Sequence, residues 1–549
     1  MGNALTTAAV TEKPSAWRTL RHTAFRNCWA SSVVSNVGSW MQDTAGTWLM
    51  TALTTSPLLI ALMQTAAGLP VLLLGYPAGA IADIFDRRQL LIFWQAWMLA
   101  TVAALSVLTL AGIVSPWTLL ALTFLLNAGA AMNNPAWQAI VPELVPREEL
   151  PNAIAVNSAG YNLARAVGPA LGGLMVAAFA SVVTGAGVVF LINSLSFVAV
   201  IAVLYNWRRS PTYKSALPAE RLSGALWSGL RYLRYTPELR ATFVRVFLFA
   251  SFASAVWALL AVVARQDLRQ GAMAYGILNG CLGAGAVVGA SFLPRLRQKM
   301  SADSIVAASS LVFAGTLATL ALVRNVPLIV LSLLAAGFAW TSALSTLNVT
   351  VQISTPPWVQ ARALGTYQMI FWGGVAWGSA FWGFLAEHLS TPISLLAACA
   401  SAIATLPLAK RFHLLQGTPP DLTSAAFNRA APQLVIEPHP DQGPVLVMIE
   451  YKIRPEDYAA FTRAIHKVRD VRLRNGAIRW GVFQDARQPD RFVETFVVDS
   501  WIDFLRQRER FSAPDRAIRD FAWSFHQGDS PPAVSYMFYA REAARNDLP

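Results

Sequence analysis

The chain has 549 residues, of which 55% are hydrophobic and only 13% charged, with a mean hydropathy of +0.44. Soluble domains carry about 25% charged residues, so the composition excludes an ordinary soluble protein and predicts a polytopic membrane protein. The net charge of +13 does not indicate nucleic-acid binding, because the basic residues lie mostly between apolar runs and in the C-terminal part.

Residues 1–26 carry basic residues with no apolar core ahead of them, which is not the pattern of a cleaved signal peptide. We therefore expect a cytoplasmic N-terminal segment and a first span that is itself the insertion signal. Twelve apolar runs follow, long enough to be transmembrane helices. The predicted spans are 27–53, 58–82, 90–113, 117–136, 154–179, 183–205, 241–263, 275–293, 305–323, 326–353, 363–385 and 393–409.

The first-half spans carry polar residues that a lipid-facing helix would lack. Asp43 is the clearest acid, and Asn36, Gln42, Asn133 and Asn162 add hydrogen-bonding groups. Each amide alone is explained by a helix–helix hydrogen bond. Together they predict a cavity for an amphipathic organic molecule.

The second span ends in "GAIADIFDRR", which places Gly79, Asp83, Asp86, Arg87 and Arg88 at the inner face. A carboxylate here can meet the positive end of a helix or an arginine, so we expect a conformational latch that holds one state and opens in another. The simpler interpretation, that the two arginines are positive-inside anchors, does not explain Asp83.

The fifth span contains "NLARAVGPALGG". Pro169 removes the hydrogen bond to the carbonyl of Arg165, and Gly168 and Gly172 form a small-residue ridge followed by Gly173. Packing explains the glycines but not Arg165, because an arginine near mid-membrane costs about 3 kcal/mol and needs a protein or water partner.

Asp43 is the partner that depth suggests for Arg165. Asp43 lies about 25 Å along its helix from Arg26, and Arg165 about 21 Å from Pro151, both counted from the inner side. We expect the two to approach or to share a hydrogen-bond network, so that protonation of Asp43 changes the charge balance. The alternative is that Asp43 caps a helix end near the outer surface.

A polar stretch, 208–240, separates two predicted six-helix bundles, 27–207 and 241–412, and contains "LSGALWSGLRYLR", the pattern of a basic amphipathic helix on the inner leaflet. If both ends of the chain are cytoplasmic, the outside loops hold only Arg265, Arg269 and Arg324 among the basic loop residues. The positive-inside rule therefore predicts cytoplasmic termini in a cell inner membrane.

The two bundles show a weak internal repeat. When "YNLARAVGPALGG" is aligned with "YQMIFWGGVAWGS" on Tyr161 and Tyr367, Gly168 matches Gly374 and Gly172 matches Gly378. Repeated halves are typical of transporters that rock two bundles about a central site.

A linker, 413–443, leads to a charged soluble domain, 444–542, with the pattern strand, helix, strand, strand, helical segment, strand. This order predicts an α+β ferredoxin-like domain. Its helical histidine, His466, is most simply a surface residue. The three cysteines, Cys28, Cys281 and Cys399, form no metal or disulfide pattern, and no lysine follows a glycine, so we expect no cofactor, no metal and no ATPase site.

Several of these stretches resemble one family. "GAIADIFDRR" is similar to the loop motif of the major facilitator superfamily, although Ile84 and Asp86 replace its usual arginine and glycine, and "ARAVGPALGG" resembles the fifth-span motif of its proton-coupled exporters. "SNVGSWMQDTAGTWLM" and the tail stretch "RLRNGAIRWGVFQD" are similar to exporters grouped with the enterobactin exporter, called transmembrane secretion effectors.

The tail also resembles dimeric α+β barrels of small monooxygenases, but relatives commonly carry histidines where this chain has Phe504 and Arg508. The expected protein is thus a proton-coupled efflux transporter of a small organic molecule (drug, siderophore or metabolite), not an enzyme. Its expected partners are the substrate, protons, the lipid bilayer and, through the tail, a second copy. One alternative is a membrane-anchored sensor or enzyme whose activity resides in the tail; another is proton-coupled import.

Overall fold

The computed structural model describes residues 16–207, 232–414, 438–439, 441–528 and 530–540, and a helix lies in each of the twelve predicted ranges. Eight of the described helices, α2, α3, α6 and α8 to α12, are long and apolar enough to cross a membrane. The helices are α1 Thr23–Leu53, α2 Pro57–Ile84, α3 Arg87–Leu110, α4 Pro116–Leu144, α5 Leu150–Ala177, α6 Val182–Asn206, α8 Pro237–Val262, α9 Ala272–Lys299, α10 Ala302–Leu322, α11 Val326–Ile353, α12 Pro357–His388 and α13 Thr391–Ala404.

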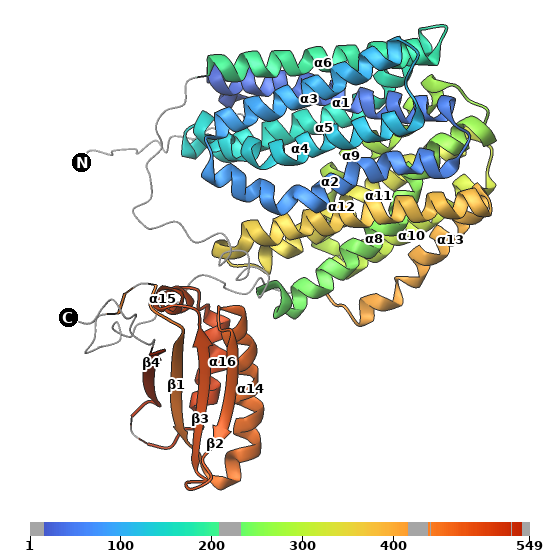
Figure 1. Cartoon of the computed structure of the whole chain (residues 1–549). Coiled ribbons are helices and arrows are strands. Elements are labelled where there is room, and N and C mark those ends of the chain that lie inside the picture. Colours follow the sequence, from blue (N-terminus) through green and yellow to red (C-terminus); the bar gives the residue numbers. More distant parts are fainter. Residues whose placement is uncertain (1–15, 208–231, 415–437, 440, 529, 541–549) are drawn as a thin grey trace, which may run out of the picture.

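The helices run side by side in one bundle, with the small C-terminal domain beside one end (Figure 1). We call the end at which α8 and α12 begin the tail face, and the other end, at which α2 and α9 begin, the opposite face. A first half, α1–α6, meets a second half, α8–α13, chiefly through α2 against α12 and α5 against α9. The bundle is thus built as two six-helix units that meet along two helix pairs.

Several helices continue through prolines that the sequence suggests as ends. α4 was expected to end at 136 but runs through Pro135 and Pro142 to Leu144, and α9 runs through Pro294. A proline is tolerated inside a bundled helix because neighbouring groups satisfy the freed carbonyl. α13 is shorter than predicted and ends at Ala404. Most of the predicted amphipathic helix in 208–240 and most of the linker 413–443 lie outside the described residues.

Equivalent glycines make equivalent contacts in the two halves. A Cβ on Gly168 of α5 would lie 3.2 Å from the carbonyl oxygen of Val37 of α1. A Cβ on Gly374 of α12 would lie 2.9 Å from the carbonyl oxygen of Phe247 of α8. In both halves the fifth helix therefore packs backbone to backbone on the first, as the aligned glycines suggest.

The C-terminal domain, which we call the tail, is a four-stranded antiparallel sheet with helices on one face (Figure 1). The strand order is β2-β3-β1-β4. The elements are β1 Val445–Lys452, α14 Tyr458–Arg474, β2 Arg479–Gln484, β3 Arg491–Val498, α15 Trp501–Glu509, α16 Ala513–Trp523 and β4 Ala533–Phe538. The single helical segment expected at 501–525 is two helices, because Asp515 accepts the backbone N–H of Ser512 at 3.2 Å and starts a new helix there.

A buried polar network holds the tail sheet to its helices. The Glu494 carboxylate is fully buried and accepts bonds from Arg472 (3.0 Å), Tyr451 (2.9 Å) and Trp480 (3.0 Å). Burial, with the nearby Glu494 carboxylate, raises the pKa of Tyr451 well above its usual range, so its hydroxyl stays protonated and donates. Each oxygen of the Glu494 carboxylate thus accepts a hydrogen bond from a side chain, in a site that water does not reach.

We expect Glu494→Ala to unfold the tail locally, because it leaves the buried Arg472 charge without its partner, a loss worth about 3–5 kcal/mol. Hydrogen exchange of β1 and β3 peptides in the full-length protein would measure the loss of protection. Glu450→Ala is the matched control, since Glu450 pairs with Arg491 at 2.9 Å at a site that is about one third exposed, where a pair contributes under about 1 kcal/mol. Equal deprotection in both variants would contradict the assignment.

Candidate functional site

Asp43 is the acidic residue that the sequence predicts in the middle of the first half. It lies in the interior of α1, which continues to Leu53, so the alternative that it caps a helix end is wrong. Its neighbours Gln42 and Thr44 are buried, yet Asp43 itself is exposed. An exposed carboxylate at this depth indicates that water reaches the middle of the bundle at Asp43.

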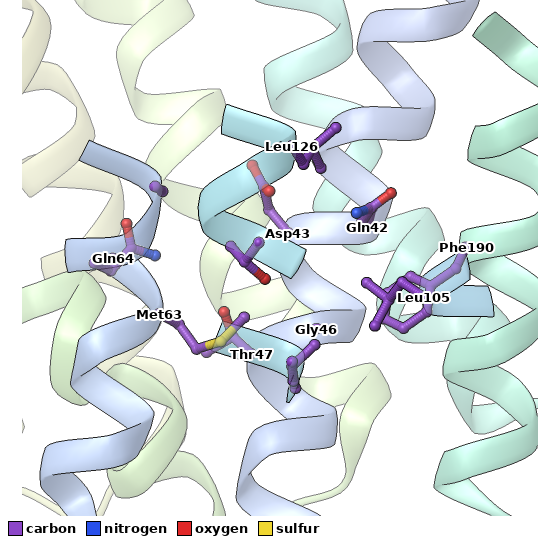
Figure 2. Close-up of a pocket in the computed structure, with 12 residues that line it drawn as sticks. Gln42, Asp43, Gly46, Thr47, Met63, Gln64, Leu105, Leu126 and Phe190 are labelled. Carbon is purple, nitrogen blue, oxygen red and sulfur yellow. The ribbon is translucent and has the colours of Figure 1, made fainter. Parts of the chain in front are cut away.

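Asp43 has polar neighbours in the first half and one, Tyr275, in the second half. Asp43 is within electrostatic range of Tyr161 on α5 and Tyr275 on α9. A cavity of about 30 Å³, room for a water molecule, is lined by Asp43, Gln42, Thr47 and Gln64 among others. Figure 2 shows Asp43 and Thr47 of α1 beside Gln64 of α2, while Gln42 points toward α6. Asp43 therefore borders a small water-sized space within the first half, with Tyr275 of the second half in electrostatic range.

Arg165 lies on α5 beside the same part of α1. Its guanidinium carbon is 5.8 Å from the ring centre of Trp40, and Tyr161 packs edge-on against that ring at 6.2 Å. Among the described residues no ion pair or hydrogen bond joins Arg165 to Asp43, but Tyr161 is within electrostatic range of both. The predicted pair thus shares one aromatic cluster on neighbouring helices without direct contact.

The glycines of the fifth-span motif bring α5 against two helices at once. A Cβ on Gly172 would lie 2.6 Å from the carbonyl oxygen of Met41 of α1, and one on Gly173 would lie 2.9 Å from the Cα of Gly276 of α9. The Arg165 carbonyl, which Pro169 deprives of its helical donor, faces Gly283 of α9 so closely that a Cβ there would lie 2.6 Å away. α5 is therefore a structural bridge between the halves.

The remaining predicted polar residues have different surroundings. Gln42 is buried and accepts a 2.6 Å hydrogen bond from Asn193 of α6. Asn133 accepts from Gln95 of α3 at 3.3 Å, and Asn36 donates to Ser32 of its own helix at 3.2 Å. Asn162, on α5, is half-buried. Gln42 and Asn133 therefore act as interhelical hydrogen-bond partners within the first half.

Sequence reasoning missed Gln64, Thr47, Tyr275 and Asn193. Asn193 had a signal, since it is an amide in one of the most apolar spans, 183–205. Gln64 had the same signal, as an amide in the apolar span 58–82, whereas Tyr275 had none because it belongs to the other half.

The predicted latch residues hold the first half together at the tail face. Arg87 donates to Glu143 of α4 at 2.9 Å, and Arg88 donates to the last carbonyls of α6, those of Leu204 (2.9 Å) and Tyr205 (2.6 Å). Asp86 caps α3 by accepting the Gln89 N–H at 3.0 Å. A Cβ on Gly79 would have nothing within 4 Å, and Asp83 lies in α2 with its side chain outside the described part.

Contacts between the halves are concentrated toward the opposite face. Ser56 of the α1–α2 link donates to Glu387 of α12 at 2.8 Å, and Arg265, after α8, donates to Thr51 at 2.9 Å. Deeper in, Thr65 donates to the Ala376 carbonyl at 2.8 Å and Asn279 to Thr44 at 3.4 Å. Ser56, Thr51 and Arg265 thus join the two halves on the opposite-face side of Asp43.

The described residues hold no group of three or more His, Cys, Asp or Glu side chains placed to bind a metal. His466 is exposed and its ring contacts Thr462 and Trp480, while Phe504 is buried against Trp501. Neither position presents a catalytic arrangement.

The two sets of six helices thus pack together along α2–α12 and α5–α9, with an exposed carboxylate on α1 of the first set. The chain belongs to the transmembrane secretion effector family of the major facilitator transporters, which it matches over residues 14–544. The match includes the tail.

Curated relatives are also transporters rather than enzymes. The chain is 29% identical over 38% of its length to the uncharacterized transporter YfiS of Bacillus subtilis, and it spans about half (49%) of that protein. It is 24% identical to the multidrug efflux pump Tap of Mycolicibacterium fortuitum over 67% of this chain and 90% of the pump. It is 23% identical to the staphyloferrin A transporter of Staphylococcus aureus over 52% of this chain and 70% of that protein.

Solved structures with the same fold are transporters as well. The nucleoside transporter NupG is 12% identical with a TM-score of 0.57, covering 72% of this chain and all (100%) of NupG. A D-xylose–proton symporter is 13% identical with a TM-score of 0.56, covering 72% of this chain and 97% of the symporter. These likenesses show the fold alone.

We expect Gly172→Ala to destabilise the bundle, because the added methyl would overlap the Met41 backbone, and overpacking costs about 1–3 kcal/mol. Thermal unfolding of the purified protein would show a lower midpoint. Gly79→Ala is the matched control: with open space at that site, the better helix propensity of alanine should leave the midpoint unchanged or raise it. Equal midpoints for the two variants would refute the close packing.

Proposed function

We propose that this protein is a proton-coupled exporter of a small organic molecule that works by alternating access. The observation that carries the proposal is Asp43, a water-reached carboxylate inside the bundle that lies within electrostatic range of both halves through Tyr161 and Tyr275. A group that gains and loses a proton where two bundles meet can bias their arrangement. The macrolide, multidrug and staphyloferrin A transporters among the relatives support a drug, siderophore or metabolite as substrate.

We propose that the twelve helices all cross the inner membrane and that the tail face is cytoplasmic. The inside loops of this topology hold most of the basic loop residues, in accord with the positive-inside rule. The bonds from Ser56 and Arg265 then close the outside, so the state described here faces inward. The units of this arrangement are residues 27–207 and 241–412, joined by 208–240, with a cytoplasmic segment 1–26 ahead of them.

Within this scheme Arg165 acts beside Asp43 through the aromatic cluster. Its charge lies over Trp40, a contact that supports a role in holding a substrate or in balancing the charge of Asp43. Asn36 and Asn162, both half-buried, add polar groups to the first half, while Gln42 and Asn133 hold neighbouring helices through their hydrogen bonds. The latch proposal rests on Arg87 and Arg88, whose bonds to α4 and α6 would have to change if the ends of the first half rearrange at the tail face.

We propose a ferredoxin-like fold for residues 444–542, following the linker 413–443, on the strand order β2-β3-β1-β4, and self-association through its open sheet face. That face carries Leu446, Met448, Val493 and Val497, none of them buried, with Phe483 and Met537 62% and 48% exposed. An apolar sheet face without helices on it is suited to pack against a second copy.

Transport into inverted vesicles tests the coupling. With a candidate panel of macrolides, siderophores and dyes, an acid interior should drive accumulation by the wild-type protein, and dissipating the gradient should abolish it. Asp43→Asn should lose this accumulation while still exchanging labelled for unlabelled substrate, because the amide binds no proton. Asp267→Asn, which removes a carboxylate paired with Arg324 at 3.4 Å after α8, is the control and should accumulate as the wild type does. Substrate transport that does not depend on the proton gradient would contradict the antiport mechanism.

A membrane-anchored sensor or enzyme whose activity resides in the tail is the alternative, which rests on the folded tail domain. Deleting the chain after Gln416 separates the two: a transporter should keep gradient-driven accumulation and lose only self-association, measured by multi-angle light scattering. Loss of all activity in a variant that still folds and inserts would favour the alternative.

A further inference from the structure

A cavity of about 210 Å³ lies between the tail and the tail face of the bundle. It is several times the share of a water molecule in the liquid, about 30 Å³. Residues from both sides line it: Tyr232, Thr236, Glu238, Ser354 and Pro356 from the bundle, and Arg474, Asn475, Arg510, Ser512, Pro514, Asp515 and Ile518 from the tail.

Three helices begin at this cavity. The residues that precede their first turns, Thr236 for α8, Pro356 for α12 and Ser512 for α16, all line it. The start of a helix carries partial positive charge and unpaired backbone N–H groups, which favour anions. α16 caps its own start through Ser512 and Asp515, so the starts of α8 and α12 are the two that contribute positive potential to this space.

The charged side chains that line the cavity also affect its electrostatic potential. Asp515 is already engaged by Arg474 and, at 3.1 Å, by Asn475, so its charge is compensated. Arg510 lies over the ring of Trp358 with its guanidinium carbon 4.3 Å from the ring centre, which joins tail to bundle. Glu238 is the other carboxylate and lies in the first turn of α8, where the helix dipole offsets it.

The unsatisfied hydroxyl of Ser354 is an independent indication that the cavity binds a ligand. Its side chain is 6% exposed and lines the cavity, and in the part of the chain that the structure describes its hydroxyl has no hydrogen-bond partner. The indole N–H of neighbouring Trp358 is likewise buried without a partner there. Burial raises the pKa of Tyr232 to about 12, and its phenol donates to the Ser354 carbonyl at 3.5 Å, so Ser354 and Trp358 are the donors without a partner. Buried donors without acceptors cost free energy unless a ligand satisfies them.

We propose that this cavity binds a phosphate group, which accepts hydrogen bonds from Ser354 and from the starts of α8 and α12 and pairs with Arg510. The phosphate belongs either to a small cytoplasmic metabolite or to an anionic lipid headgroup at the membrane surface. Because residues of both domains contact it, the bound phosphate fastens the tail to the starts of α8 and α12.

Hydrogen exchange of the full-length protein in nanodiscs tests the binding and separates the two sources. In phosphatidylcholine discs, adding inorganic phosphate should slow exchange of peptides covering Ser512–Ile518 if the site takes a free phosphate; matched potassium chloride controls for ionic strength. Replacing the lipid with phosphatidylglycerol, without phosphate, should slow exchange if the site takes a headgroup. Unchanged exchange in both arms overturns the proposal.

Ser354→Ala separates a ligand site from a structural one. Because the hydroxyl has no partner among the described residues, its loss should leave the melting temperature unchanged or raised. The phosphate or phosphatidylglycerol content giving half of the protection should rise about tenfold, the effect of losing one hydrogen bond to a charged group. Ser342→Ala on α11, the helix that ends just before Ser354, is the control: its hydroxyl donates to the Phe338 carbonyl at 2.9 Å, and the variant should bind as the wild type does. Unchanged binding by Ser354→Ala would exclude the site.

Discussion

The close crossing of α5 with α1 and α9 is the constraint on which the rest of the bundle depends. In a membrane the hydrophobic effect does not drive helices together, so association relies on packing, and packing is best where small residues let backbones touch. Gly168 and Gly172 supply this on the α1 side, and Gly173 opposite Gly276 supplies it on the α9 side. Arg165 and Tyr161 are carried on the same helix, which sets their position relative to Asp43.

The two halves share this glycine packing but differ in the side chains beside it. Gly374 and Gly378 pack α12 on α8 as their counterparts pack α5 on α1, but Phe371 occupies the position that corresponds to Arg165. Phe371 is buried and lies edge-on to Trp340 at 5.6 Å, within a cluster of aromatic rings. At this position the first half therefore carries a charged side chain and the second an aromatic ring.

The tail adds a second kind of constraint. Its fold rests on a fully satisfied polar network at Glu494, whereas its contact with the bundle leaves Ser354 and Trp358 with donors that have no partner in the described part of the chain. Buried donors that no protein group satisfies can donate hydrogen bonds to a ligand. The positions of Arg510 and Trp358 tie that site to the start of α12, which also packs against α2 of the first half.

The sequence by itself determined the membrane class, the approximate position of each long helix that the structure describes, the glycine repeat and the order of strands along the tail. Hydrophobic runs, proline and glycine act locally, so they can be interpreted without neighbours. It also singled out Asp43 and Arg165, because a charge inside an apolar run is costly wherever the helix lies. Helix ends near Pro135 and Pro142 were misjudged, since whether a proline ends a helix depends on what surrounds it.

Only the tertiary structure decided what these residues touch. That Arg165 lies over Trp40 rather than against Asp43, that Arg87 pairs with Glu143, and that Tyr275 approaches Asp43 all follow from how helices far apart in the chain are assembled. The cavity at Ser354 depends on two domains separated by a linker. Contacts of this kind arise from the packing of whole surfaces, and no local pattern of residues records them.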